Sequence, residues 1–365
     1  MFSFIISFLV SLLICLLIIR YSHLHSHITS DPVKGGPQKF HIKPTPRIGG
    51  LAVLGGITAG AIVFYLQDKD FKEVFALILI CSLPLFVGGL AEDLTKKISA
   101  KVRLLLCIVS ALLVYFIADV KIVRVDLLLF DDLLEFMPLS LLITTVAIAG
   151  FSNAINIIDG FNGLASGVSI IILTGLAYVA FKVNDIFILF SCIVLIAAII
   201  SFFVCNYPRG LIFLGDSGAY LIGFFIAVIS VLIVKRNPQV SAWFPMLLVI
   251  YPVWETIFSV YRKKILRGTS PFHPDPLHLH MLVYKRILKW TLGSKDAKYI
   301  TRRNSATSVY LWGLTFIAFV PAVLFWQKTL LLQICTFLWI LMYVWLYRKI
   351  VRFKIHKINN RKVFP

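Results

Sequence analysis

The sequence predicts an all-α, polytopic integral membrane protein in which residues 1–365 form a single transmembrane domain. Hydrophobic residues make up 59% of the chain, and only 15% of its residues are charged. The mean hydropathy is +0.90, more than the core of a soluble domain of this length requires. Several apolar runs reach the roughly 18–20 residues that cross a bilayer. Because these runs are continuous rather than short and alternating, they favour helices over a closed barrel.

We expect ten to eleven spans along the chain. The first run has no basic segment before it and no small-residue cleavage site after it, which favours a transmembrane helix over a signal peptide. The segment Val123–Phe136 is expected to form a short hairpin or an interfacial helix without chemistry. The expected spans are 2–19, 48–66, 73–91, 102–118, 139–156, 163–181, 186–204, 211–234, 242–260, 308–325 and 330–347.

The loop charges predict an orientation. Of the 36 Lys and Arg residues, 28 lie in alternate connecting segments, and the largest of these segments is the basic, histidine-containing loop 261–307. Positively charged loops stay in the cytoplasm. We therefore expect the N-terminus outside, and the C-terminus and the loop 261–307 in the cytoplasm.

Asp216 lies at the start of a span in Phe213–Gly218, between glycines. A carboxylate at a membrane boundary is costly without a partner, so it indicates a functional site. Acids also end two other spans on the same predicted side. Together with the net charge of +19, they predict a phosphate site held by a metal, with Asp216 as the principal ligand. The alternative is a glycine kink in which Asp216 caps a helix.

The third span ends in Glu92 and Asp93, which are followed by Lys101 and Arg103. Carboxylates can hold a hard cation or accept a proton, and cationic side chains can neutralise phosphate oxygens. The alternative is a charge cluster that only anchors the end of the helix.

Polar side chains also mark the end of the fifth span. Asn153, Asn156 and Asp159 recur every three residues, which places them on nearly one helix face. The segment 160–163 then breaks the helix and exposes backbone amides that suit a nucleotide or a carbonyl group. The alternative is hydrogen bonding between helices.

Two basic segments complete the pattern. The loop 261–307 carries Arg267, His278 and His280, and its cations suit a diphosphate or anionic headgroups. Two histidines at i, i+2 are a weak metal signal, so phosphate contact and proton transfer stay open beside metal binding. Arg47 stands at the mouth of the second span, where it can touch an anionic ligand.

Taken in order, these motifs resemble the polyprenyl-phosphate N-acetylhexosamine-1-phosphate transferases, in the WecA/TagO branch related to MraY. The resemblance runs from about Pro44 to His280. It implies transfer of an N-acetylhexosamine-1-phosphate from a UDP-sugar, UDP-GlcNAc by default, to undecaprenyl phosphate, with release of UMP. It implies Mg²⁺, with Mn²⁺ as the alternative cofactor. It also implies the first step of a lipid-linked cell-surface glycan, at the bacterial inner membrane with the active site facing the cytoplasm.

The resemblance also implies roles for single residues. The metal ligand is Asp216. The catalytic residues are Asp93, Glu92, Asp159, Lys101, His278 and His280. The substrate-binding residues are Asn156, Gly160, Phe161, Asn162, Asn206, Phe213, Arg47 and Arg267.

The chain departs from the family pattern at three positions. Glu92 replaces the first acid of an Asp-Asp pair, Asn162 replaces a second aspartate, and Met281 stands where a third histidine is usual. The longer arm of Glu92 makes Asp93 the expected essential acid.

The expected partners are a UDP-N-acetylhexosamine, undecaprenyl phosphate and membrane lipids, with no nucleic acid. A homodimer, the identity of the sugar and the glycan pathway are left open. Two other functions are consistent with parts of the pattern. One is a transporter of an anionic lipid or sugar conjugate, since intramembrane acids and broken helices occur there too. The other is a catalytically inactive scaffold, because of Glu92 and Asn162.

Overall fold

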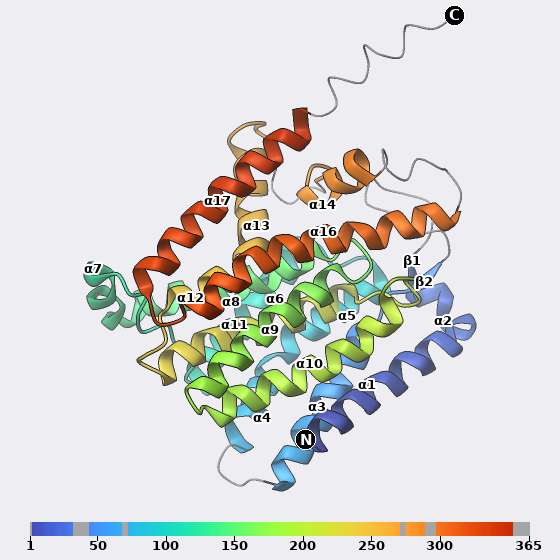
Figure 1. Cartoon of the computed structure of the whole chain (residues 1–365). Coiled ribbons are helices and arrows are strands. Elements are labelled where there is room, and N and C mark those ends of the chain that lie inside the picture. The colour runs from blue at the N-terminus through green and yellow to red at the C-terminus, as the bar shows by residue number, and fades with distance from the viewer. Residues whose placement is uncertain (1, 32–43, 68–71, 271–274, 289–296, 353–365) are drawn as a thin grey trace, which may run out of the picture.

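The computed structural model describes residues 2–31, 44–67, 72–270, 275–288 and 297–352. Within these residues, ten helices are long and apolar enough to cross a membrane, which confirms the predicted polytopic all-α architecture. Figure 1 shows the helices packed as one bundle, with α11 in its middle and α16 and α17 along one side.

The long helices follow the predicted apolar runs. They are α1 (Phe2–Arg20), α3 (Gly49–Gln67), α4 (Lys72–Cys81) with α5 (Leu83–Thr95), α6 (Ala100–Ile117), α8 (Met137–Ile158), α9 (Leu164–Lys182), α10 (Ile186–Asn206), α11 (Gly215–Arg236), α16 (Ala297–Leu324) and α17 (Thr329–Arg352). The short elements are α2 (Ser22–Thr29), α7 (Leu128–Asp131), η1 (Asp132–Glu135), α12 (Trp243–Leu248), α13 (Ile250–Lys264), α14 (Leu279–Leu282), the π-helix η2 (Val283–Leu288), and the strands β1 (Ser30–Asp31) and β2 (Thr45–Pro46).

The predicted span 242–260 is not one helix. It divides at Val249 into α12 and α13. Pro252, in the first turn of α13, has no N–H to donate to the carbonyl of Leu248, so a continuous helix would lose that bond. The expected loop 261–307 is also partly helical, because α13 continues to Lys264 and α16 already begins at Ala297. Of the two structures expected for Val123–Phe136, the short helices α7 and η1 are found.

The helix α11 forms the centre of the bundle, and 94% of its apolar 18-residue segment is buried inside the protein. Glycines let its neighbours approach closely. A Cβ added to Gly89 of α5 would lie 2.6 Å from Ser217 Cα, and one added to Gly223 would lie 2.7 Å from Ser152 Cα of α8. Such small residues are what helices in a membrane use to pack closely. The close approach also brings the acids at the helix ends together.

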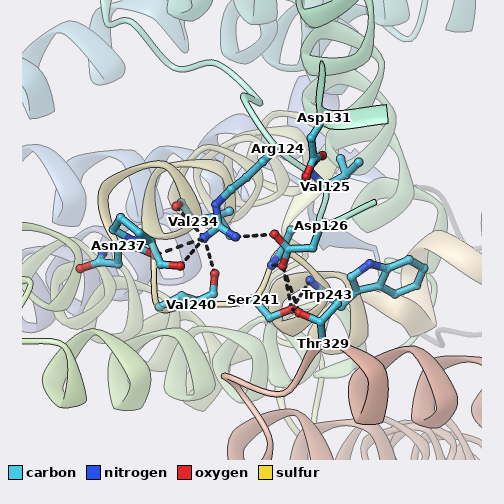
Figure 2. Close-up of polar contacts among 12 residues, drawn as sticks. Arg124, Val125, Asp126, Asp131, Val234, Asn237, Val240, Ser241, Trp243 and Thr329 are labelled. Carbon is cyan, nitrogen blue, oxygen red and sulfur yellow. Dashed lines mark hydrogen bonds and ion pairs between the residues drawn. The ribbon is translucent and has the colours of Figure 1, made fainter. Parts of the chain in front are cut away.

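The two ends of α11 define two polar regions. The Asp216 end is where α5 and α8 finish and α3 and α11 begin. The Arg124 end is where α11 finishes and α12 and α17 begin, and Figure 2 shows its polar contacts. There Arg124 pairs with Asp126, and Arg124 Nη2 donates to the carbonyls of Val234 at 3.3 Å and Val240 at 2.5 Å.

Candidate active site

The segment before α3 is paired with the segment before α11. Phe213 N donates to Pro46 O at 2.8 Å, and Gly49 N donates back to Phe213 O at 2.9 Å. Gly50 N donates to Leu214 O at 2.9 Å. These backbone bonds fix Arg47, which lies between Pro46 and Gly49, beside the first turn of α11.

Asp93 is fully buried and caps the N-terminus of α11 from another helix. Its carboxylate accepts hydrogen bonds from Asp216 N at 2.8 Å, Ser217 N at 3.0 Å and Ser217 Oγ at 2.7 Å. A carboxylate in this place satisfies the free amides of the first turn and faces the positive end of the helix dipole. The Nε of Arg47 lies 3.4 Å from Asp93 Oδ1. Asp93 therefore holds Asp216 in place, and its predicted catalytic role stays a prediction.

Asp216 is 3% exposed and is surrounded by donors from three other segments. Arg47 Nη2 lies 2.5 Å from Asp216 Oδ1, and Asn156 Nδ2 of α8 donates to the same oxygen at 3.0 Å. Arg103 of α6 forms an ion pair with Oδ2. Lys101 was predicted to be a site residue, whereas Arg103 was given no role of its own. Residues two apart lie on nearly opposite faces of a helix, and in the structure Lys101 is on the exposed face.

Asp159 follows the last residue of α8 and is half-buried beside the same groups. The pKa of Asp159 is raised to about 7, chiefly by burial; the Arg47 guanidinium opposes this rise and the Asp93 carboxylate contributes to it. Arg47 is thus electrostatically linked to Asp93, Asp159 and Asp216. The prediction that acids from three separate helices converge is in accord with this geometry.

The loop after Asp159 is held by amide side chains. Asn162 N donates to Asn304 Oδ1 of α16 at 2.8 Å, and Asn162 Nδ2 donates to Pro208 O at 3.0 Å. Gly163 N donates to Asn206 Oδ1 at 2.5 Å. Asn162 and Asn206 were predicted to bind substrate. In the structure they bind the protein's own backbone, so the contribution found here is to the shape of the loop.

The two histidines lie against this loop. The rings of His278 and His280 stack with centroids 5.1 Å apart and planes inclined by 9°. The His280 ring meets Phe161 edge-on at 5.6 Å, and both side chains are buried. Burial lowers the pKa of His280 to about 3, and His278 beside it adds to the effect, so His280 is neutral at pH 7.

The other predicted site residues are less closely tied to this centre. Glu92 is half-buried, and its Oε2 accepts a hydrogen bond from Ile98 N at 2.7 Å, which supports the turn after α5. Phe213 is half-buried, and Arg267 is exposed. The neighbouring residues 271–274 of the basic loop lie outside the described residues.

The oxygen donors at the Asp216 end suit a hard cation. Among the described residues, no group of three or more His, Cys, Asp and Glu side chains comes together as a metal cage. Mg²⁺ does not need such a cage, because it is commonly held by one or two carboxylates and by phosphate oxygens of the substrate. Asp216 Oδ2 is buried without a hydrogen-bond partner, apart from its ion pair with Arg103. The residues therefore fit Mg²⁺ if the substrate supplies the remaining ligands.

Comparisons with known proteins agree with this geometry. The family model described as Glycosyl transferase family 4 matches residues 75–234, which contain Asp93, Asp159 and Asp216. The predicted family resemblance is confirmed. The chain is 28% identical over 298 residues to the probable undecaprenyl-phosphate N-acetylglucosaminyl 1-phosphate transferase of Bacillus subtilis (strain 168), covering 81% of this chain and 78% of the relative.

Two further relatives fit the same pattern. The undecaprenyl-phosphate alpha-N-acetylglucosaminyl 1-phosphate transferase of Thermotoga maritima is 27% identical, over 69% of this chain and 72% of the relative. The phospho-N-acetylmuramoyl-pentapeptide-transferase of Lactobacillus helveticus is 26% identical, over 80% of this chain and 91% of the relative. The similarity therefore extends to proteins whose names give different sugar groups.

Proposed function

We propose that this protein transfers an N-acetylhexosamine-1-phosphate from a UDP-sugar to undecaprenyl phosphate and releases UMP. The observation that carries the proposal is the position of Asp216. It is buried at the end of a membrane helix and is surrounded by Arg47, Arg103 and Asn156. Phosphoryl transfer depends on positioned positive charge, which the arginines supply, and a carboxylate beside them can hold a metal ion. The relatives named as transferases favour this function over the transporter.

The chemistry is one phosphoryl transfer. An oxygen of the acceptor phosphate attacks the β-phosphorus of the UDP-sugar and forms a new P–O bond. The bond from the β-phosphorus to the oxygen bridging it to the α-phosphate breaks, and UMP leaves with that oxygen. Charge develops on the leaving phosphate, so positioned cations lower the barrier.

The side chains at the Asp216 end have distinct parts in this proposal. Arg47 and Arg103 bind and orient the phosphates. Asp216, with oxygens of Asn156 and Asp159 nearby, would hold Mg²⁺, which when bound neutralises charge on the diphosphate. Asp93 orients Asp216 through the first turn of α11. His280, neutral at pH 7, lies against the 160–163 loop, where it can donate a hydrogen bond to the donor substrate.

The direct test is a UMP-release assay on the purified protein in detergent. Undecaprenyl phosphate is the acceptor, and a panel of UDP-N-acetylhexosamines identifies the donor. We expect UMP release with Mg²⁺ that EDTA abolishes and added Mg²⁺ restores. No UMP from any donor, by a folded protein, would contradict the proposal. UMP release that persists in EDTA would contradict the proposed metal while leaving the transfer reaction intact.

We also propose that the Asp216 end faces the cytoplasm of a bacterial inner membrane. Single cysteines at two exposed positions test this orientation. Thr269→Cys follows α13, and Glu135→Cys lies in η1 on the opposite side. A membrane-impermeant thiol reagent should label Glu135→Cys in spheroplasts, and Thr269→Cys only after lysis. The reverse pattern would overturn the orientation.

A further inference from the structure

Glu255 is a fully buried acid that the proposed chemistry does not use. It lies on α13, and its carboxylate is satisfied by three donors from two other elements. His278 Nδ1 lies 2.9 Å from Oε1, Leu279 N donates to Oε1 at 3.1 Å, and Tyr343 Oη of α17 donates to Oε2 at 2.5 Å. A buried carboxylate is tolerated only when it is hydrogen-bonded in this way. Such a network orients its members more than it adds stability.

The His278 ring has a carboxylate beside each of its two edges, and it is hydrogen-bonded to one of them. Glu255 engages Nδ1, and Nε2 lies 4.0 Å from Asp275 Oδ2. Asp275 is itself fixed, because it pairs with Arg262 and accepts a hydrogen bond from Ser259 Oγ at 2.8 Å. The His278 ring is therefore oriented mainly by its hydrogen bond with Glu255, with a second anchored carboxylate near its other edge.

The orientation passes from His278 to His280 by stacking, because the two rings lie nearly parallel. His280 Nε2 lies 3.5 Å from the point that a Cβ on Gly160 would occupy. His280 Nδ1 is buried and has no hydrogen-bond partner among the residues that the structure describes. The pair thus ends on the loop that follows Asp159, with one nitrogen unpaired.

We infer that Glu255 is a positioning residue that sets the orientation of His278 and, through the stacked rings, holds His280 against the Asp159 loop. The inference rests on the proposed function, because its readout is UMP release. Tyr343 holds the opposite oxygen of the same carboxylate. It therefore shares the structural environment of Glu255, but among the described residues no hydrogen bond joins it to either histidine ring.

A double-mutant cycle tests this inference. Glu255→Gln should lower kcat/KM for the UDP-sugar by about 10- to 100-fold, the loss typical when a carboxylate that orients a functional histidine is removed. His278→Ala should cost a similar factor, and the double variant should lose no more than the worse single variant. Residues that act as one unit give such non-additive losses.

Tyr343→Phe is the matched control. It removes a hydrogen bond from the same buried carboxylate, so its melting temperature should fall as that of Glu255→Gln does, while its kcat/KM stays near the wild-type value. A purely structural role of Glu255 predicts instead that both variants lose activity in proportion to their loss of stability.

Three results would decide against the inference. They are wild-type kcat/KM in Glu255→Gln, additive losses in the cycle, or an equal activity loss in Tyr343→Phe. If Glu255→Gln does not fold, Glu255→Asp, which keeps the charge but shortens the arm, takes its place in the same cycle. Absence of UMP release by the wild-type protein would instead refute the proposed function, and the inference with it.

Discussion

The two ends of α11 both carry an arginine–aspartate ion pair, but the pairs are completed differently. At the Arg124 end the protein's own backbone and hydroxyl groups complete the pair. Asp126 accepts hydrogen bonds from Ala242 N at 2.7 Å and Ser241 Oγ at 3.0 Å, and Arg124 covers carbonyls at the end of α11 (Figure 2). At the Asp216 end the partners are charged or amide side chains from three separate segments.

The difference distinguishes a charge that supports the fold from one available for chemistry. A guanidinium at the C-terminal end of a helix and a carboxylate at its N-terminal end both complement the helix dipole. Arg124 lies at the C-terminal end of α11, and Asp93 lies at its N-terminal end. Asp216 is not needed as a cap, because Asp93 already supplies it. Its carboxylate is held by side chains, which can rearrange around a ligand, rather than by backbone groups, which cannot.

The proposed difference between the two ends of α11 is wrong if substitution of Asp216 and substitution of Asp126 have the same effect on activity. Asp216→Asn should lower UMP release by about 10³-fold, as expected for the loss of a charge that stabilises the transition state. Asp126→Asn should keep its activity and lower the melting temperature. Equal activity losses in the two variants, measured at a temperature where both are folded, would show that the ends do not differ in function.

The adjacent acids at the end of α5 sharpen the comparison. Asp93→Asn should lose about 10²-fold in UMP release, because an amide has one acceptor oxygen where the carboxylate serves three donors. Glu92→Gln should lose less, since within the described part of the chain the Glu92 carboxylate bonds to the turn at Ile98. Glu92→Asp should be tolerated. The ranking is wrong if Glu92→Gln is the more damaging change.

At the Arg124 end the expected effect is on stability. Arg124→Gln leaves several carbonyls at the end of α11 without their donor, which should cost about 1–3 kcal/mol of the free energy of unfolding. Thermal melting in detergent measures the loss, and Lys121→Gln, which removes a half-exposed ion pair with Asp119 at the same end, is the control. The donor KM should not change. A raised KM with an unchanged melting temperature would contradict the structural role of Arg124.

The smallest expected effect comes from Asp159. Its pKa rises from 3.8 to about 7 on folding, so between these values the folded state holds a proton that the unfolded state has lost. The wild-type protein therefore loses stability as the pH rises from about 4 to 7, and Asp159→Asn does not. The variant should match the wild type near pH 4 and melt ~2–5 °C higher at pH 8. An offset that is the same at every pH would contradict this assignment.

Much of this architecture could be predicted from the sequence because a bilayer imposes a simple requirement of length and apolarity. The spans and the acids at their ends follow from that requirement. The break between α12 and α13 at Val249 was not predicted, although Pro245 and Pro252 were visible in the sequence. A proline within a span does not by itself end a helix, because neighbouring helices can satisfy the backbone groups it leaves free.

The partners of each side chain could not be predicted in the same way. Helices α3 and α11 are apolar on all sides, so the sequence does not reveal which face meets which neighbour. For that reason the bonds from Asp93 to the start of α11 were not foreseen, and the sequence of α6 likewise did not show whether Lys101 or Arg103 faces the acids. Glu255 did carry a usable signal. It is the acid within the predicted span 242–260, and a charge in that position indicates a function by default.

The hydrogen bonds from α16 to the loop after Asp159 limit which segments can be exchanged between related proteins. Asn304, Ser308 and Trp312 of α16 bind the backbone of residues 162 and 163, with Ser308 Oγ donating to Asn162 O at 2.6 Å and Trp312 Nε1 donating to Gly163 O at 3.1 Å. All three lie beyond residues 75–234, the part that the family model matches. A chimera that exchanged that part alone would receive the loop without the groups that shape it, so the exchanged module must include the later helix.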